Sequence, residues 1–127
     1  MSKDIDQYFK TIDPDEIITI VCHIKRVNKD MLFNGRYKVL VEARQLIAYF
    51  MRLYCHGRDY RYNTIRYKRL KVTDIGLFLN QDHSTVSYAI KSVKKFMHIY
   101  PVYRRDVEMI DDIIRRFRFQ LPKTTVE

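Results

Sequence analysis

The segment TDIGLFLNQDHSTVSYAI, residues 73–90, contains two amphipathic stretches separated by a short polar break. The break, Asn80-Gln81-Asp82, consists of residues that favour turns and helix starts over helix interiors. In the second stretch the apolar residues fall within an arc of about 100° when successive residues are placed 100° apart. The inward-facing residues are Val86, Ala89, Ile90, Val93 and Met97, and the outward-facing ones are His83, Ser84, Thr85, Ser87 and Lys91. The pattern predicts a helix-turn-helix over about residues 73–97.

The expected second helix starts with the small polar residues Asp82, His83, Ser84 and Thr85. Side chains of this size at an exposed helix start can enter the major groove of DNA and reach base edges. Hydroxyl groups and free N–H groups at a helix start can also bind phosphate. A simpler interpretation is that Asp82 only caps the helix and that the two hydroxyl residues are ordinary helix-start residues. Capping explains Asp82, but it explains neither the imidazole of His83 nor the basic segment nearby.

Positive charge is concentrated in the middle of the chain. The net charge is +9, and residues 34–72 contain ten Lys or Arg against two Asp or Glu. The flanking segments 1–33 and 73–127 contain five against six and nine against seven. A basic block of this density favours a polyanionic partner, with nucleic acid ahead of an acidic membrane. The alternative is a solvated basic face that has no partner.

Three further segments have the spacing of amphipathic helices. Segment 13–27 starts with Asp13 at the expected N-cap and Pro14 in the first turn, and segment 101–119 starts at Pro101. Segment 37–55 has an apolar stripe formed by Leu40, Ala43, Ile47, Phe50 and Tyr54. Its opposite, basic face carries Lys38, Arg44, Gln45 and Arg52. The chain therefore has a long basic helix before the predicted helix-turn-helix.

We expect an all-α fold that forms one compact domain over residues 1–127. The low content of 3 Gly and 3 Pro supports this fold class, because strand-rich folds of this size need more turns. Residues 56–70, in which Arg and Tyr alternate around Gly57 and Asn63, are consistent either with a prolonged helix or with a basic hairpin-like loop. The tail, residues 120–127, is expected to be frayed.

The sequence lacks the residues that several classes of function need. The three glycines cannot form a phosphate-binding GxxxxGK[ST] or GxGxxG loop. The pairs Cys22-His23 and Cys55-His56 are adjacent residues, which diverge on a helix instead of converging on a zinc ion. Each cysteine lies in an apolar helical context, so we expect two buried thiols and no disulfide. Neighbours such as Asp82, His83 and Ser84 cannot adopt the geometry of a catalytic triad. We therefore expect no enzyme activity, no metal and no cofactor.

The chain has no apolar run of about 18 residues and no secretory signal pattern at its first residues, so we expect a cytoplasmic protein without a membrane partner.

The stretches VEARQLIAYFMRLYC and VTDIGLFLNQDHSTVSYAIKSV, taken together, resemble the C-terminal DNA-binding domain of the bacterial replication initiator DnaA. That family has an Arg-Gln pair on a long basic helix, followed by a helix-turn-helix with the sequence RDHTTV or RDHSTV. The resemblance covers about residues 13–98, and the DHSTV segment after Ile75-Gly76 is a specific match. It implies sequence-specific binding of double-stranded DNA at a short initiator-box-like site, in replication initiation or its regulation.

The resemblance also implies a role for each matching residue. The base-reading residues in the major groove would be Asp82, His83 and Ser84, and Arg36 would enter the minor groove. The phosphate-binding residues would be Arg44, Gln45, Arg52 and Thr85. We add Lys91 to the phosphate group because it lies on the outward-facing side of the same helix.

The chain departs from the family pattern in three places. Gln81 replaces the usual Arg, the turn before it is one residue shorter, and the tract 56–70 is longer than the usual connection. The ATPase module of the initiator has no counterpart here, which leaves open a fragment of an initiator or a stand-alone protein of a phage or mobile element. The alternative function is a protein-interaction module or a transcriptional regulator that uses the same helices. In that case the helix 101–119 could form a dimer seam through Met109, Ile110, Ile113, Ile114 and Phe117.

Overall fold

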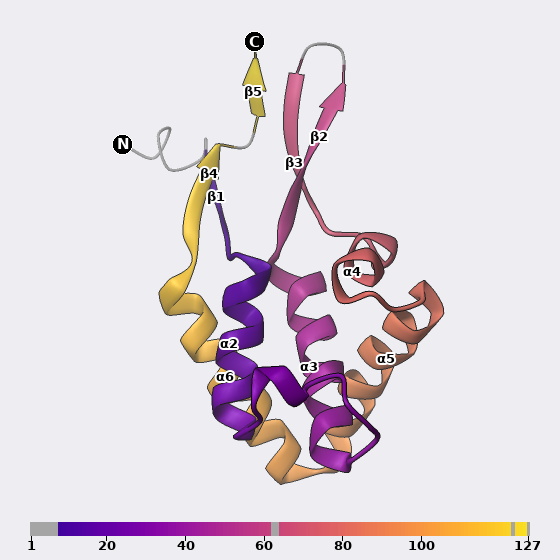
Figure 1. The fold of residues 1–127 in the computed structure, drawn as a ribbon. Coiled ribbons are helices and arrows are strands. Elements are labelled where there is room, and N and C mark those ends of the chain that lie inside the picture. Colours follow the sequence, from indigo (N-terminus) through magenta and orange to yellow (C-terminus); the bar gives the residue numbers. More distant parts are fainter. Residues whose placement is uncertain (1–7, 62–63, 123, 127) are drawn as a thin grey trace.

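A computed structural model describes residues 8–61, 64–122 and 124–126 of the chain. This part contains five α-helices, one short 3-10 helix and five strands (Figure 1). The helices are α2 (Pro14–Lys25), α3 (Lys38–Tyr54), α4 (Val72–Leu79), α5 (His83–Ile99) and α6 (Pro101–Phe117), with η1 at Lys29–Met31. The strands are β1 (Tyr8–Thr11), β2 (His56–Arg61), β3 (Thr64–Arg69), β4 (Phe119–Pro122) and β5 (Thr124–Val126). The helices pack into one body, and the strands extend from one end of it.

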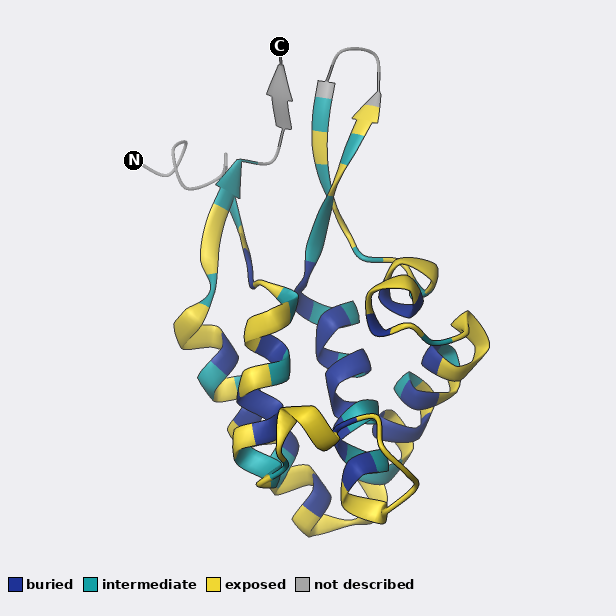
Figure 2. Cartoon of the chain, viewed as in Figure 1, coloured by how far each residue is buried: buried dark blue, intermediate teal, exposed yellow. Residues whose placement is uncertain are grey.

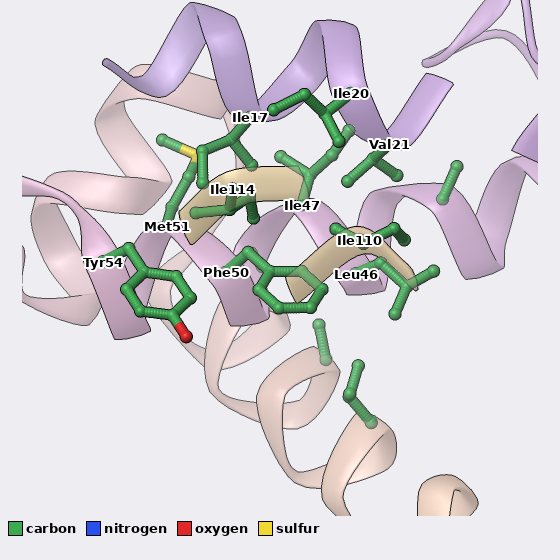
Figure 3. Close-up of a cluster of buried hydrophobic side chains, with 14 of the residues drawn as sticks. Ile17, Ile20, Val21, Leu46, Ile47, Phe50, Met51, Tyr54, Ile110 and Ile114 are labelled. Carbon is green, nitrogen blue, oxygen red and sulfur yellow. The ribbon is translucent and has the colours of Figure 1, made fainter. Parts of the chain in front are cut away.

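Helix α3 lies at the centre of the body and packs against α2, α4 and α5. Its buried side chains also meet those of α6 (Figure 3). The predicted apolar stripe of α3 is confirmed, since Leu40, Ala43, Ile47, Phe50 and Tyr54 are all buried. Figure 2 shows this buried layer between helices whose outer faces are exposed. Fully burying one such aliphatic or aromatic side chain stabilises a fold by about 1.5–3 kcal/mol, so this layer determines how the other helices are held.

The predicted helix starts are also confirmed. Asp13 is the N-cap of α2, and its carboxylate accepts a hydrogen bond of 3.1 Å from the N–H of Asp15. Pro14 and Pro101 occupy the first turns of α2 and α6. Proline suits this position because its missing N–H would have no partner inside the helix.

Helices α4 and α5 are joined by a tight turn at the predicted break. Asn80 ends α4 in the left-handed conformation, with φ 55° and ψ 47°, and its N–H points to the carbonyls of Gly76 and Leu77. The N–H of Gln81 donates to the carbonyl of Gly76 at 2.7 Å. A Cβ atom on Gly76 would lie 2.6 Å from the carbonyl oxygen of Gln81, so the turn can only close this tightly over a glycine. The turn sets where α5 begins relative to α4.

The prediction of an all-α fold is wrong in part, because the mostly helical chain also forms two small sheets. In the tract 56–70, the described residues form β2 and β3, which pair antiparallel with Arg58 opposite Tyr67 and Tyr60 opposite Ile65; residues 62–63 lie outside the described residues. This is the hairpin alternative of the two that the sequence left open. Tyrosine, isoleucine and threonine favour strands, and alternation with arginine suits a ribbon with exposed faces.

The predicted frayed tail, residues 120–127, forms strands in its described part, residues 120–122 and 124–126; residues 123 and 127 lie outside the described residues. Strand β4 pairs antiparallel with β1, and β5 adds to the edge of β3, so the second sheet has the order β2-β3-β5. The pairing of β1 with β4 joins segments more than a hundred residues apart, as in Lys10 opposite Gln120. The pairing of β3 with β5 joins segments about sixty residues apart, as in Ile65 opposite Thr125. Such distant partners cannot be identified from local sequence patterns.

The predicted dimer seam on α6 is largely used inside the chain. Ile110 and Ile114 are fully buried, and they pack next to Ile17 and Ile47 in the core (Figure 3). Ile113 is half-buried against the core, whereas Met109 and Phe117 are 47% and 61% exposed. The apolar stripe of α6 therefore holds this helix against α2 and α3.

Candidate nucleic-acid interface

The first turn of α5 is exposed and polar. Asp82, His83, Ser84 and Thr85 are all exposed, as the outward face of the predicted helix requires. Asp82 occupies the N-cap position, but its side chain makes no capping hydrogen bond. Its carboxylate instead accepts a hydrogen bond from the hydroxyl of Ser84, and Nδ1 of His83 lies 3.5 Å from its other oxygen. The main partner of the Asp82 carboxylate is therefore the hydroxyl of Ser84, with smaller contributions from the backbone N–H groups of His83 and Ser84.

These contacts determine the charge of the turn. The hydrogen bond from Ser84, together with the neighbouring His83, lowers the pKa of the Asp82 carboxyl. Asp82 is therefore an ionised hydrogen-bond acceptor at neutral pH. Because Ser84 donates its hydroxyl hydrogen to Asp82, its oxygen is left to accept a hydrogen bond from a ligand. The turn thus presents acceptor atoms from Asp82 and Ser84 beside an imidazole.

The linker before α3 is held by Arg44. Its Nη1 donates to the carbonyl oxygens of Leu32 at 2.9 Å and of Gly35 at 3.1 Å. Gly35 has a φ of 89°, a conformation that favours glycine over other residues. Arg36 follows directly and its side chain is exposed. The arm that carries Arg36 is therefore fixed to the basic face of α3.

A groove of about 540 Å³ lies where this linker, α3 and the α4–α5 turn meet. Its walls include four of the predicted site residues: Arg36, Arg44, Gln45 and Thr85. Seven residues that the sequence reasoning did not assign to the site also line it: Phe33, Gly35, Val41, Asn80, Gln81, Tyr88 and Ala89. Among these, Tyr88 is 69% exposed and lies one turn after Ser84 and Thr85. An aromatic residue among the polar residues of this helix face is the sequence signal that could have identified Tyr88.

The other two predicted phosphate ligands lie outside this groove. Lys91 is exposed on α5, two turns after Ser84. Arg52 is half-buried near the end of α3, on the same arc as Gln45 when residues are placed 100° apart. Arg44 and Gln45 are also half-buried, and Oε1 of Gln45 is buried without a hydrogen-bond partner. On the basic face of α3, Arg44, Gln45 and Arg52 are thus less accessible than Lys38, which is exposed at the start of the helix.

In the described part of the chain, no group of three His, Cys, Asp or Glu residues could hold a metal ion. Cys22 and Cys55 are both free and buried. Burial raises the pKa of both thiols, to about 12 for Cys55, so neither is a reactive thiolate at neutral pH. A membrane-spanning helix is likewise absent from residues 8–61, 64–122 and 124–126, because none of the helices there is both long and apolar enough.

The comparisons with known proteins identify distant relatives. No protein-family model matches the chain. The chain is 27% identical over 109 residues to the chromosomal replication initiator protein DnaA of Bacteroides fragilis and 25% identical over 109 residues to that of Bacteroides thetaiotaomicron. Each alignment covers 84% of this chain and 20% of the relative. The chain thus spans about a fifth of the length of these replication initiators, to which it is similar at the level of a distant homologue.

Proposed function

We propose that the chain binds double-stranded DNA at a specific short sequence, with α4 and α5 acting as a helix-turn-helix. The observation that carries this proposal is the groove that joins Arg36, Arg44, Gln45 and Thr85 beside the exposed first turn of α5. Residues from three separate segments meet there, and each was expected to contact DNA. The net charge of +9 and the similarity to replication initiators support the same function.

In this proposal α5 enters the major groove with its first turn. Asp82 accepts a hydrogen bond from an exocyclic amine such as N4 of cytosine, and Ser84 makes a similar contact through its free lone pairs. His83 is the third base-reading residue. Arg36 reaches the adjacent minor groove from the linker, where an extended arm fits and a helix does not.

Phosphate contacts hold this arrangement in register. Thr85 and Lys91 on α5, and Gln45 and Arg52 on α3, are the proposed phosphate ligands. Arg44 takes part in two ways, because one nitrogen of its guanidinium holds the linker and the other N–H groups are left to reach phosphate. Catalysis has no place in the proposal, and the site acts as a reader of DNA.

The proposed biological role is replication initiation or its regulation, because the relatives are named as chromosomal replication initiator proteins. The proposal uses only the part of those proteins that aligns with this chain, which is 20% of their length.

The experiment that tests the function is selection of bound duplexes from a random pool, followed by fluorescence anisotropy at fixed salt. The selected duplex should bind more tightly than a scrambled duplex of equal length and composition. Specific binding typically exceeds non-specific binding by 10³-fold or more at physiological salt, so even a partial site should be resolved. Equal affinity for the two duplexes would reject base reading and favour the protein-interaction alternative.

A further inference from the structure

We propose that the hairpin formed by β2 and β3 is a second DNA-binding element, which binds phosphates of the duplex beside the sequence read by α5. The proposal rests on the proposed function for the direction from which DNA approaches. It goes beyond that function because it assigns a longer footprint to the chain and a partner to the basic, tyrosine-rich hairpin.

The hairpin is strongly basic. Residues 56–71 contain six Lys or Arg and one acid, Asp59. Arg58, Arg66, Lys68 and Arg69 are exposed. Asp59 forms an ion pair of 3.1 Å with Lys68, which leaves most of the positive charge of the ribbon without a carboxylate on the ribbon itself. A surface of this kind attracts the phosphate backbone without regard to sequence.

The charge of the hairpin continues onto the proposed DNA-binding helices. The N–H of Leu70 donates to the carbonyl of Cys55 at 3.1 Å, which closes the base of the hairpin directly before α4. A hollow of about 250 Å³ at this base is lined by four basic residues, Arg58, Lys68, Arg69 and Lys71, and by two acids, Asp59 and Asp74. Asp59 pairs with Lys68, and Asp74 accepts a hydrogen bond from the N–H of Lys71. Basic side chains therefore outnumber acids where β3 leads into α4.

Helix α3 supplies a second connection. Arg52 lies seven residues after Gln45 on the same arc, a rise of about 10 Å along the helix axis toward the hairpin. Positive charge thus runs from the groove, past Arg52, to the base of β2. A duplex that contacts Arg44 and Arg52 would extend along this line toward the ribbon.

The hairpin is long enough to contact DNA beyond the site read by α5. Strands β2 and β3 have six residues each, which gives a reach of about 20 Å at roughly 3.4 Å per residue. Figure 1 shows this ribbon extending beyond the helical body. Duplex DNA carries one negative charge per about 1.7 Å of its axis, so 20 Å corresponds to about a dozen phosphates on roughly six base pairs.

The hairpin is held in place on one face by aromatic contacts. The ring of Phe9 on β1 lies 4.5 Å from that of His56 and 5.9 Å from that of Tyr67, measured between centroids. Further out, side-chain hydrogen bonds with Tyr60 and Tyr67 raise the pKa of Arg58 and hold its guanidinium on the same face. A ribbon that is already ordered loses little conformational entropy on binding, so its contacts add directly to affinity.

Directed cleavage of DNA tests the position of the hairpin. An iron chelate attached to Tyr60→Cys should cut the selected duplex outside the base pairs protected by α5. The same chelate on Glu108→Cys, an exposed position on α6, should not cut there. The native thiols do not interfere, because Cys22 and Cys55 are buried. Cleavage within the α5 site alone, or none from Tyr60→Cys on DNA that is bound, would overturn the proposal.

Charge removal tests the phosphate contacts. The double variant Arg66→Gln, Lys68→Gln removes two exposed charges from the same face of β3, because alternate residues of a strand share a face. It should lower the slope of log affinity against log salt by about 1.8, at roughly 0.9 for each lost phosphate contact. The control Arg105→Gln, Arg116→Gln removes the same charge from exposed positions on α6 and should leave the slope unchanged. Equal slopes for the hairpin variant and the wild type, or equal losses in both variants, would contradict the proposal.

The possible outcomes distinguish a failure of the hairpin proposal from a failure of the proposed function. If the wild type prefers the selected duplex but the hairpin variant matches it in slope and cleavage pattern, only the hairpin proposal fails. If the wild type shows no sequence preference but the hairpin variant alone loses salt dependence, only the base-reading function fails. A wild type that binds no duplex overturns both.

Discussion

Nη1 of Arg44 lies 3.1 Å from the carbonyl oxygen of Gly35, and this hydrogen bond ties the linker before α3 to the face of α3 itself. The same nitrogen donates to Leu32. Arg36 is the next residue after Gly35, so the position of its side chain depends on Arg44. One arginine therefore organises the arm that carries another.

Replacing Arg44 by alanine should destabilise both the fold and the proposed complex. Two backbone carbonyls lose a charged donor, and we expect a loss of about 1–3 kcal/mol in the free energy of unfolding. Urea denaturation measures this loss. Arg44→Lys keeps the charge but has no planar fork, so it should recover only part of the stability. An unchanged free energy of unfolding in Arg44→Ala would show that the linker is held by other contacts.

Gly76→Ala should disturb the turn between α4 and α5. The new methyl group would lie 2.6 Å from the carbonyl oxygen of Gln81, which is part of the backbone and cannot rotate away. We expect a destabilisation of about 1–3 kcal/mol, as for other insertions into a packed site, and weaker DNA binding because α5 is displaced. Thermal unfolding and anisotropy measure the two effects. Leu77→Ala, at a position on the same helix that is 84% exposed, is the control. A fully stable Gly76→Ala would contradict the close approach.

The helices could be predicted because their signals are local. Asp13 with Pro14, and the break at Asn80, mark helix ends through the chemistry of a few adjacent residues. The sheets could not be predicted in the same way, since β1 pairs with β4 at the other end of the chain. Within the hairpin, the alternation of Arg and Tyr suited a ribbon, but the support from Phe9 comes from a distant segment.

In the candidate site, too, features with a local sequence signal could be predicted, and features that depend on distant segments could not. The exposed first turn of α5 follows from the helical period of its own sequence. The hydrogen bonds of Arg44 to the linker do not, because a sequence pattern shows that this arginine lies on a polar face but not which groups it meets. The sequence of α5 alone does not show that Tyr88 lines the groove, because the groove is formed by α3 and by the linker as well as by α5.

His83→Ala tests base reading at the start of α5. The variant should lose about 1–3 kcal/mol of binding free energy on the selected duplex, the usual cost of one base-edge contact, and much less on scrambled DNA. Discrimination between the two duplexes should therefore shrink. The side chain is exposed, so stability should stay within about 0.5 kcal/mol. Equal losses on both duplexes would assign His83 to phosphate contact.

His56 should make stability depend on pH below neutrality. Burial, with the nearby charges of Arg69 and Arg118, lowers the pKa of this imidazole, although its hydrogen bond to the carbonyl of Tyr54 offsets part of the effect. Above about pH 6.5 the ring is neutral in both states and contributes no pH dependence. As the pH falls through 6.5, the unfolded chain takes up a proton that the folded chain resists, so the free energy of unfolding should decrease.

Urea unfolding of the wild type and of His56→Gln at pH 7.5 and pH 5.5 measures this dependence. Glutamine can keep a hydrogen bond to Thr11, whose hydroxyl oxygen lies 3.1 Å from Nδ1 of His56, but it does not titrate. The decrease between the two pH values should be smaller in the variant. A decrease of the same size in both proteins would assign the pH dependence to other groups.

Arg36 should recognise the minor groove beside the major-groove site. The minor groove is about 6 Å wide, too narrow for a helix, and A·T-rich steps narrow it further and deepen its negative potential. Arg36 is exposed on a linker that Arg44 holds in place, and it lines the same groove of the protein as Thr85. The alternative is that Arg36 contacts a phosphate or only solvent, in which case the base pairs facing the arm would not matter.

Two duplexes that share the site read by α5 but carry A·T or G·C pairs at the flank facing the arm separate these alternatives. The wild type should prefer the A·T flank, because an arginine in a narrowed groove gains electrostatic energy there that a phosphate contact does not. Arg36→Ala should lose this preference and still respond to changes in the bases read by His83. Lys38→Ala, which removes an exposed charge two residues further on, should keep the preference. If Arg36→Ala and the wild type rank the two flanks alike, the arm does not enter the minor groove, and the flank preference must come from the shape of the DNA beneath α5.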